Sequence, residues 1–175
     1  MATLAKHIKQ QDESTKVIFV GPCTAKKAEA QLAEVKPYVD CVLTFEELQA
    51  LFDSKDIDLV NLEETSLDNA SYFGRLFAKS GGLSSATAQA MAEQDINFDV
   101  KPVVCDGIEA CRMALLKLNK GVLDGNFIEG MACVGGCVGG AGNLTHSTEK
   151  SASKIEKHSQ ESAKKTIGES VSDIK

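Results

Sequence analysis

Short apolar runs alternate with helical patterns along most of the chain. Four runs rich in β-branched residues predict strands, and apolar positions three or four residues apart predict helices between them. This alternation is typical of a mostly parallel sheet covered by helices. The strands are expected over 17–20, 39–43, 102–105 and 126–129, and the helices over 3–11, 25–35, 45–51, 84–94 and 108–118.

The pattern therefore predicts an α/β fold with one mostly parallel, four-stranded sheet and helices on both faces. Residues 1–147 are expected to form this lobe. Residues 148–175 are rich in Ser, Lys and Glu and are expected to form a polar helical tail packed on the same domain. Two apolar helical stripes are expected to lie in the core, namely Phe45, Leu48 and Leu51, and Ile108, Cys111, Leu115 and Leu118.

Composition narrows the class of protein. The chain has 175 residues, of which 43% are hydrophobic, enough to bury one substantial core. It has no apolar run long enough for a transmembrane helix and no apolar signal-peptide core. Its six cysteines are interpreted as reduced thiols of a cytoplasmic protein. A net charge of −6 without a basic stripe argues against nucleic-acid binding.

The first stretch with candidate chemistry runs from Pro22 to Glu29. Cys23 follows the first predicted strand and precedes a predicted helix. Open α/β sheets place their ligands at the carboxyl ends of strands, and a helix N-terminus stabilises a thiolate. Cys23 is therefore a candidate ligand of a metal or cluster.

The second stretch follows the fourth predicted strand and places Cys133 and Cys137 among glycines. Glycine lets a backbone close on a bulky ligand and leaves amides free to point at it. Thiolates in such surroundings suit a soft metal or an iron–sulfur cluster. A structural zinc site fits less well, because three cysteines are one ligand short of the usual four.

Together the two stretches resemble the second and third cluster-binding signatures of iron-only (diiron) hydrogenases. The second signature reads roughly Pro-Cys-x-x-Lys-x-x-Glu, as residues 22–29 do here. The third reads roughly Phe-x-Glu-x-Met-Ala-Cys-x-Gly-Gly-Cys. The chain matches it at Phe127, Glu129, Met131, Ala132, Cys133, Gly135, Gly136 and Cys137.

The resemblance implies a role for each matched residue. Cys23, Cys133 and Cys137 would be three of the four ligands of a 4Fe–4S cluster, with Cys137 bridging to a diiron unit. Lys26 would donate a hydrogen bond to a cyanide of that unit, and Met131 would pack beside it. The implied activity is an oxidoreductase that reversibly reduces protons to dihydrogen with electrons from ferredoxin.

The family's first signature, Thr-Ser-Cys-Cys-Pro, is absent from these residues. We therefore expect a C-terminal fragment of the catalytic domain, whose missing N-terminal lobe supplies the fourth cysteine. The isolated chain is expected to be inactive and to bind no cofactor. Departures from the family pattern favour a sensory or low-activity member, and they occur at Val134, Ala141, Asn143 and Leu144.

Two alternatives remain at this point, a hydrogen-sensing regulatory hydrogenase and a non-catalytic, hydrogenase-related iron–sulfur protein. Lys26 and Met131 favour a hydrogenase, because the resemblance assigns them to the diiron ligands. The other three cysteines, Cys41, Cys105 and Cys111, are expected to be small buried apolar residues.

Overall fold

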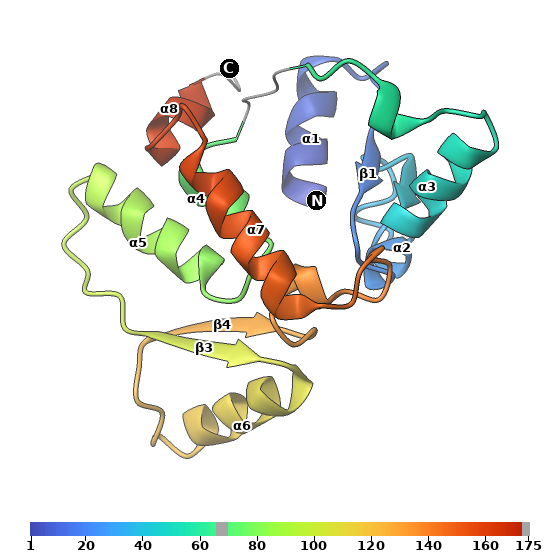
Figure 1. The fold of residues 1–175 in the computed structure, drawn as a ribbon. Coiled ribbons are helices and arrows are strands. Elements are labelled where there is room, and N and C mark those ends of the chain that lie inside the picture. Colours follow the sequence, from blue (N-terminus) through green and yellow to red (C-terminus); the bar gives the residue numbers. More distant parts are fainter. Residues whose placement is uncertain (66–69, 173–175) are drawn as a thin grey trace. The chain divides into compact units, whose positions relative to one another are not determined.

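A computed structural model of the chain describes residues 1–65 and 70–172, shown as a ribbon in Figure 1. The chain divides into two compact units. Unit 1 comprises residues 1–63 and 140–146, and unit 2 comprises residues 64–139 and 147–175. The division expected from the sequence, a lobe over 1–147 and a tail over 148–175, stays a prediction. None of the helices in the described part of the chain is long and apolar enough to cross a membrane.

Unit 1 is built around a parallel pair of short strands, in which Ile18 lies opposite Cys41 and Val20 opposite Leu43. Small and branched side chains from the first helix, the crossover and the second strand form its core, namely Ala5, Ala30, Val35, Val39 and Val42. The elements of this unit are α1 (Ala2–Gln11), β1 (Ile18–Val20), α2 (Ala25–Glu29), β2 (Cys41–Leu43), α3 (Phe45–Asp53) and the short 3-10 helix η1 (Leu59–Asn61).

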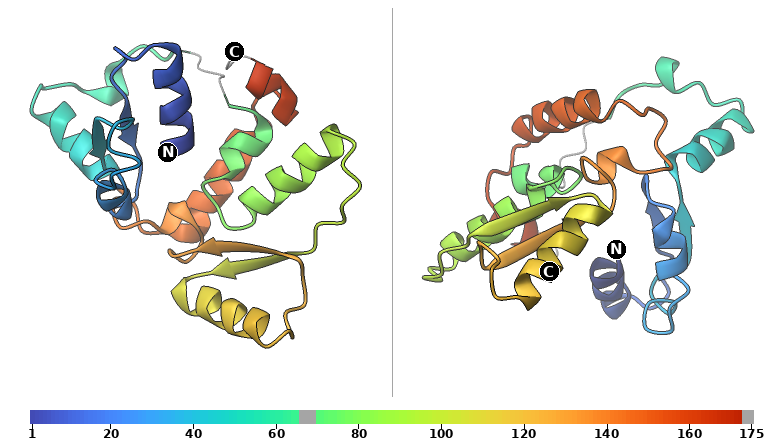
Figure 2. Two further views of the ribbon diagram at one scale, coloured as in Figure 1. Left: turned by 180° about the vertical axis from the view of Figure 1, so that it is seen from behind. Right: turned by 90° about the horizontal axis from the view of Figure 1, so that it is seen from below.

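Unit 2 contains a second parallel pair, with Pro102 opposite Phe127 and Asp106 opposite Met131. Helix α6 covers one side of this pair and α5 lies on the other, as both Figure 1 and the rear view in Figure 2 show. Its elements are α4 (Tyr72–Leu76), α5 (Gly82–Glu93), β3 (Pro102–Asp106), α6 (Ile108–Asn119), β4 (Phe127–Met131), the short 3-10 helix η2 (Cys137–Gly139), α7 (Thr148–Gln160) and α8 (Ile167–Ser172).

The four predicted strands are present, but the prediction of one four-stranded sheet is wrong. The structure has two separate two-stranded parallel sheets, β1–β2 and β3–β4. A crossover connection joins the two strands of each pair, and it contains α2 in the β1–β2 pair and α6 in the β3–β4 pair. Apolar periodicity identifies a strand and its faces, but it does not say which strands pair.

The burial expected for both helical stripes is also wrong. Ile108 on α6 is 71% exposed, Leu115 58% and Leu118 53%, because α6 packs on the sheet through smaller side chains such as Ala114. On α3, Leu51 is exposed while Phe45 and Leu48 are half-buried. On the first strand, the apolar side chain of Ile18 is 58% exposed.

The C-terminal segment packs on unit 2, with α7 against α4 and α8 against α5. Arg75 Nη1 donates to the carbonyl of His158 at 2.7 Å, and the buried Ser162 hydroxyl donates to the carbonyl of Ala70 at 2.8 Å. Polar contacts therefore hold a segment whose apolar pattern is weak. The end of the predicted tail, residues 173–175, lies outside the described residues.

Asp40 directly precedes β2, and its side chain binds the residue that directly precedes β1. Its carboxylate accepts hydrogen bonds from the backbone N–H of Val17 at 2.8 Å and from Lys9 Nζ, also at 2.8 Å. Lys16 Nζ lies 3.3 Å away on the other oxygen. Lys9, and after it the Val17 N–H, hold the pKa of Asp40 well below its ordinary value. The charged carboxylate is therefore the form that supports the fold.

We expect Asp40→Asn to lower the free energy of unfolding at neutral pH. A carboxyl whose pKa is depressed on folding contributes stability above its unfolded pKa and loses it as pH falls through the folded pKa. The difference between wild type and variant should therefore shrink as pH falls below about 5. Urea unfolding between neutral and acidic pH tests this, with Glu34→Gln, an exposed site in the same unit, as control. A difference that stays constant with pH would contradict the assignment.

Candidate functional site

Cys23 lies in the turn between β1 and α2, as the sequence predicts, and is half-buried. The N–H of Gly21 donates to the carbonyl of Leu43 at 3.1 Å, which extends the strand pairing by one residue. Thr24 is then the N-cap residue of α2. The parallel pair therefore places the Cys23 thiol beyond its carboxyl end and before the first turn of the helix.

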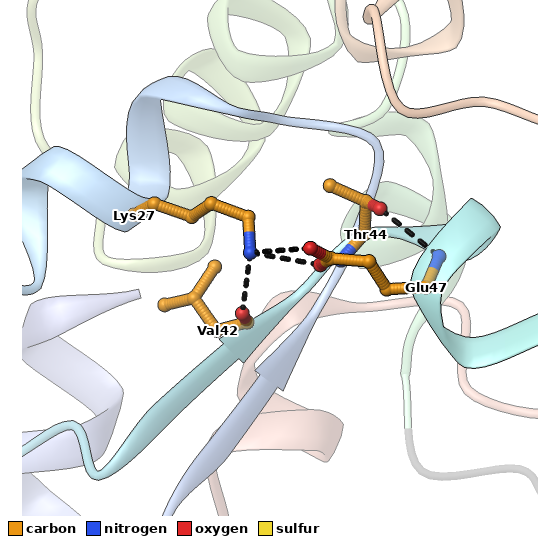
Figure 3. Close-up of polar contacts among 4 residues, drawn as sticks. All are labelled: Lys27, Val42, Thr44 and Glu47. Atoms are coloured by element: carbon orange, nitrogen blue, oxygen red, sulfur yellow. Dashed lines mark hydrogen bonds and ion pairs between the residues drawn. The ribbon is translucent and has the colours of Figure 1, made fainter. Parts of the chain in front are cut away.

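Lys27 links helix α2, which lies within the Pro22–Glu29 signature, to the rest of unit 1 (Figure 3). Its ammonium donates to the carbonyl of Val42 at 3.2 Å and to both carboxylate oxygens of Glu47, at 2.9 and 2.8 Å. Glu47 also closes a capping box with Thr44 at the start of α3. Lys27, followed by the Thr44 N–H, lowers the pKa of Glu47. One lysine thus ties α2, β2 and α3 together beside the cysteine turn.

Lys26, the lysine that matches the signature, makes a different contact. Its ammonium forms an ion pair with Glu29, the glutamate of the same signature, one helical turn away. Both side chains remain partly exposed, at 33% and 29%. Ammonium has three donors, so the pair with Glu29 leaves Lys26 able to donate elsewhere.

Gly142 brings the end of the glycine-rich stretch against the Cys23 turn. Its N–H donates to the carbonyl of Pro22 at 3.0 Å, and its carbonyl accepts from the N–H of Phe45 at 3.2 Å. A Cβ added at Gly142 would lie 2.6 Å from Cβ of Thr44. Only glycine fits this close approach, which makes residues 140–146 part of unit 1.

The loop that carries the other two signature cysteines follows β4 in unit 2. Met131 ends the strand and is half-buried, as is Cys133, whereas Cys137 is exposed at the start of η2. The N–H of Gly107 donates to the carbonyl of Met131 at 2.9 Å. The loop therefore begins from a fixed point at the carboxyl end of the second parallel pair.

The glycine content led us to expect loop amides that are free to point at a ligand. Instead, these amides donate hydrogen bonds to other groups of the protein. Gly136 N–H donates to the carbonyl of Cys133 at 3.0 Å, and Gly139 N–H donates to the carbonyl of Gly136 at 3.0 Å. Val138 N–H donates to the carbonyl of Ala78, also at 3.0 Å. The loop is short of side chains, so backbone contacts supply its order instead.

Glu129 fixes the protein backbone near the cysteine loop. Its side chain, on β4, is one of the largest fully buried side chains in the described residues. It accepts from the N–H of Gly81 at 2.9 Å and from the N–H of Ser84 at 2.8 Å, and it also accepts from the Ser84 hydroxyl. A buried carboxylate needs such donors to offset its desolvation. Glu129 is thus an anchor between β4 and the first turn of α5.

The three cysteines outside the signatures differ from one another. Cys105 is buried at the end of β3, as predicted, and burial and then the neighbouring Cys111 raise the pKa of its thiol. Cys111 is half-buried, and its Sγ lies 3.8 Å from the carbonyl oxygen of Cys105. Cys41 is exposed at the start of β2, so its expected burial is wrong.

All six cysteines carry thiols rather than disulfides. Cys23 belongs to unit 1, and Cys133 and Cys137 belong to unit 2. Within the described residues, no group of three or more His, Cys, Asp or Glu side chains is arranged to hold a metal ion. The structure adds Asp106 and Ser80, which contact the Cys133–Cys137 loop and which sequence reasoning missed. The position of Asp106 at a strand's carboxyl end was the available signal.

Comparison with known proteins gives consistent matches. A family model described as the C-terminal domain of the iron only hydrogenase large subunit matches residues 1–141. Iron hydrogenase 1 of Clostridium pasteurianum is 28% identical over 173 residues, which cover 79% of this chain and 30% of that protein. Nuclear prelamin A recognition factor of Homo sapiens is 27% identical over 177 residues, covering 77% of this chain and 38% of that protein.

Solved structures agree with the sequence matches. A structure reported for oxygen inactivation of an FeFe-hydrogenase, through the 2Fe subcluster of its H cluster, superposes with a TM-score of 0.67 at 18% identity. The match covers 98% of this chain and 60% of that one. At this identity the likeness shows the fold. The chain spans 30% and 38% of the two curated relatives it matches.

We expect Glu129→Gln to destabilise unit 2. The amide nitrogen of Gln would face a backbone N–H, so a buried donor would lose its acceptor at a cost of about 2–3 kcal/mol. Urea unfolding followed by circular dichroism measures this loss. Glu109→Gln is the control, because Glu109 pairs with Arg112 in solvent, where an ion pair contributes less than about 1 kcal/mol. Equal effects of the two substitutions would contradict the anchor role.

Proposed function

Because the chain belongs to the family defined by the C-terminal domain of the iron-only hydrogenase large subunit, we propose that Cys23, Cys133 and Cys137 are three of the four thiolate ligands of its 4Fe–4S cluster. The observation that supports this most directly is their placement. Cys23 follows the carboxyl end of one parallel strand pair, and the Cys133–Cys137 loop follows the carboxyl end of the other. Thiolates are the ligands that iron–sulfur clusters require.

The donor set fits the cluster but does not complete it. Three thiols in the matched signatures leave one position of a four-thiolate shell without a ligand. We propose that the fourth cysteine comes from an N-terminal lobe outside these 175 residues, consistent with the share of the relatives that the chain spans. The cysteine signatures would then be divided between parts of the protein that must assemble around the cluster.

When bound, the 4Fe–4S cluster and its diiron unit would supply the reversible reduction of protons to dihydrogen with electrons from ferredoxin. The chain's own residues would hold and orient them. Cys137 would be the ligand shared with the diiron unit. Lys26 would keep its ion pair with Glu29 and donate a further N–H to an anionic cyanide. Met131 would contribute an apolar, polarisable contact at the end of β4.

The second candidate is a hydrogenase-related iron–sulfur protein without the diiron unit. The match to the nuclear prelamin A recognition factor favours it, because that relative is nearly as similar as the hydrogenase. The departures at Val134, Ala141, Asn143 and Leu144 favour instead a sensory or low-activity member of the family. Infrared bands of bound carbonyl and cyanide separate the candidates, since only the diiron unit carries those ligands.

We expect Cys137→Ser to abolish these infrared bands in the complete protein. A serine hydroxyl is a poor replacement for the thiolate that would bridge the two iron units. Cys41→Ser is the matched control, because Cys41 is also exposed and lies outside both signatures. Iron content and the visible absorption of the cluster are measured in parallel. Bands that persist in Cys137→Ser would show that the ligand assignment is wrong.

We expect the 175-residue chain alone to evolve no hydrogen from reduced methyl viologen above a buffer control. Three thiolates leave an iron site exposed to solvent, and the fourth ligand would be absent. The chain is reconstituted anaerobically with iron and sulfide and with a synthetic diiron complex that carries the carbonyl and cyanide ligands, and gas chromatography of the headspace measures the product. Hydrogen evolution by the chain would mean that the catalytic centre needs no further lobe.

A further inference from the structure

Three residues from separate segments of unit 2 form a closed ring of hydrogen bonds at the centre of the cysteine loop. The N–H of Gly135 donates to Oδ1 of Asp106 at 2.6 Å. The carbonyl of Gly135 accepts from the N–H of Ser80 at 3.1 Å. The Ser80 hydroxyl then donates to the same Oδ1 of Asp106 at 2.7 Å. Both ends of the Gly135 residue are therefore held.

The ring rests on supports that are themselves fixed. Asp106 ends β3, and the register of the sheet places it opposite Met131, where the loop begins. Ser80 precedes Gly81, whose N–H is bound by the buried Glu129. Gly135 has a φ of +83°, and an added Cβ would lie 2.0 Å from Cγ2 of Thr148, the first residue of α7. Strand β3, the start of α5 and the start of α7 thus meet at one loop residue.

We propose that Asp106 is a positioning residue, whose carboxylate sets the conformation of the Cys133–Cys137 loop before any metal binds. Gly135 lies between the two cysteines, so fixing its backbone fixes the path from one thiol to the other. A loop that is already ordered loses less conformational entropy when it takes up a ligand. Only the link to a cluster depends on the proposed function; the ring itself is a property of the metal-free chain.

A carboxylate suits this role better than a neutral side chain. Hydrogen bonds to a charged acceptor are about twice as strong as those between neutral groups. Glycine also carries the largest ordering cost of any residue. The loop has glycines at 135, 136 and 139, so it needs strong backbone contacts to be ordered. Asp106 supplies one such contact by accepting from the Gly135 N–H, and the same oxygen accepts from the Ser80 hydroxyl.

Amide hydrogen exchange of the metal-free 175-residue chain tests the proposal. Three variants are compared with wild type: Asp106→Ala removes the acceptor, Asp106→Asn keeps an acceptor but not the charge, and Asp99→Ala is a control at an exposed aspartate outside the loop. We expect the Gly135 amide to exchange about tenfold faster in Asp106→Ala than in wild type, in a chain that remains folded. Asp106→Asn keeps only a weaker, neutral acceptor and should exchange at a rate between those of wild type and Asp106→Ala. Asp99→Ala should match wild type.

Alkylation of Cys133 by iodoacetamide, followed by mass spectrometry, gives a second readout, and the half-buried thiol should react faster in Asp106→Ala. Equal Gly135 exchange in wild type and Asp106→Ala would overturn the proposal. So would an Asn variant as well protected as wild type, because the charge of the carboxylate would then contribute nothing to the order of the loop. Should Asp106→Ala unfold, Ser80→Ala removes one bond of the ring and is expected to accelerate Gly135 exchange in a folded chain.

These outcomes are separate from those of the proposed function. Loss of Gly135 protection in Asp106→Ala, together with infrared bands that persist in Cys137→Ser, would leave the positioning role intact and remove the ligand assignment. The reverse pair of results would keep the cluster ligands and show that the loop is ordered by other contacts.

Discussion

The parallel register of β3 and β4 is the constraint on which the cysteine loop depends. It places Asp106 opposite Met131. The last residue of β3 therefore carries a carboxylate, and it lies beside the residue at which β4 ends and the cysteine loop begins. In parallel pairs both carboxyl ends lie at the same edge, which is why the carboxylate reaches Gly135. A shift of one residue would turn the Asp106 side chain to the other face of the sheet and remove this contact.

Unit 1 uses the same principle with different chemistry. The pairing of Val20 with Leu43 continues through the N–H of Gly21, and Cys23 follows directly. Here a cation rather than an anion fixes the surroundings, since Lys27 binds β2 through Val42 and α3 through Glu47. Lys27 is thereby committed to structure, whereas its neighbour Lys26 forms an ion pair with the partly exposed Glu29. The two adjacent lysines of α2, Lys26 and Lys27, therefore have separate roles.

The sequence predicts most of the elements because their signals are local, although the helix expected over 25–35 ends at Glu29. The capping box at Thr44 and Glu47 marks the start of α3, and Gly121, with a φ of +68°, follows the end of α6. Strand pairing is not local, so the single four-stranded sheet was wrong. Burial is not local either. The stripe of Ile108, Leu115 and Leu118 shows correctly that residues 108–119 are helical, but which face is covered depends on what packs there.

The same distinction between local and non-local signals applies to the candidate site. The signature cysteines could be found from their spacing, and the strand ends that carry them from the apolar runs. The contacts of Asp106 and Ser80 with the loop could not, because these residues are distant in sequence from Gly135 and meet it only through the fold. The glycines show why such partners are needed. Gly135 and Gly136 adopt a positive φ, which side chains disfavour, and neither has a side chain to bury. The glycines therefore cannot order the loop through side-chain packing, and its order depends on its backbone hydrogen bonds and on polar groups elsewhere in unit 2.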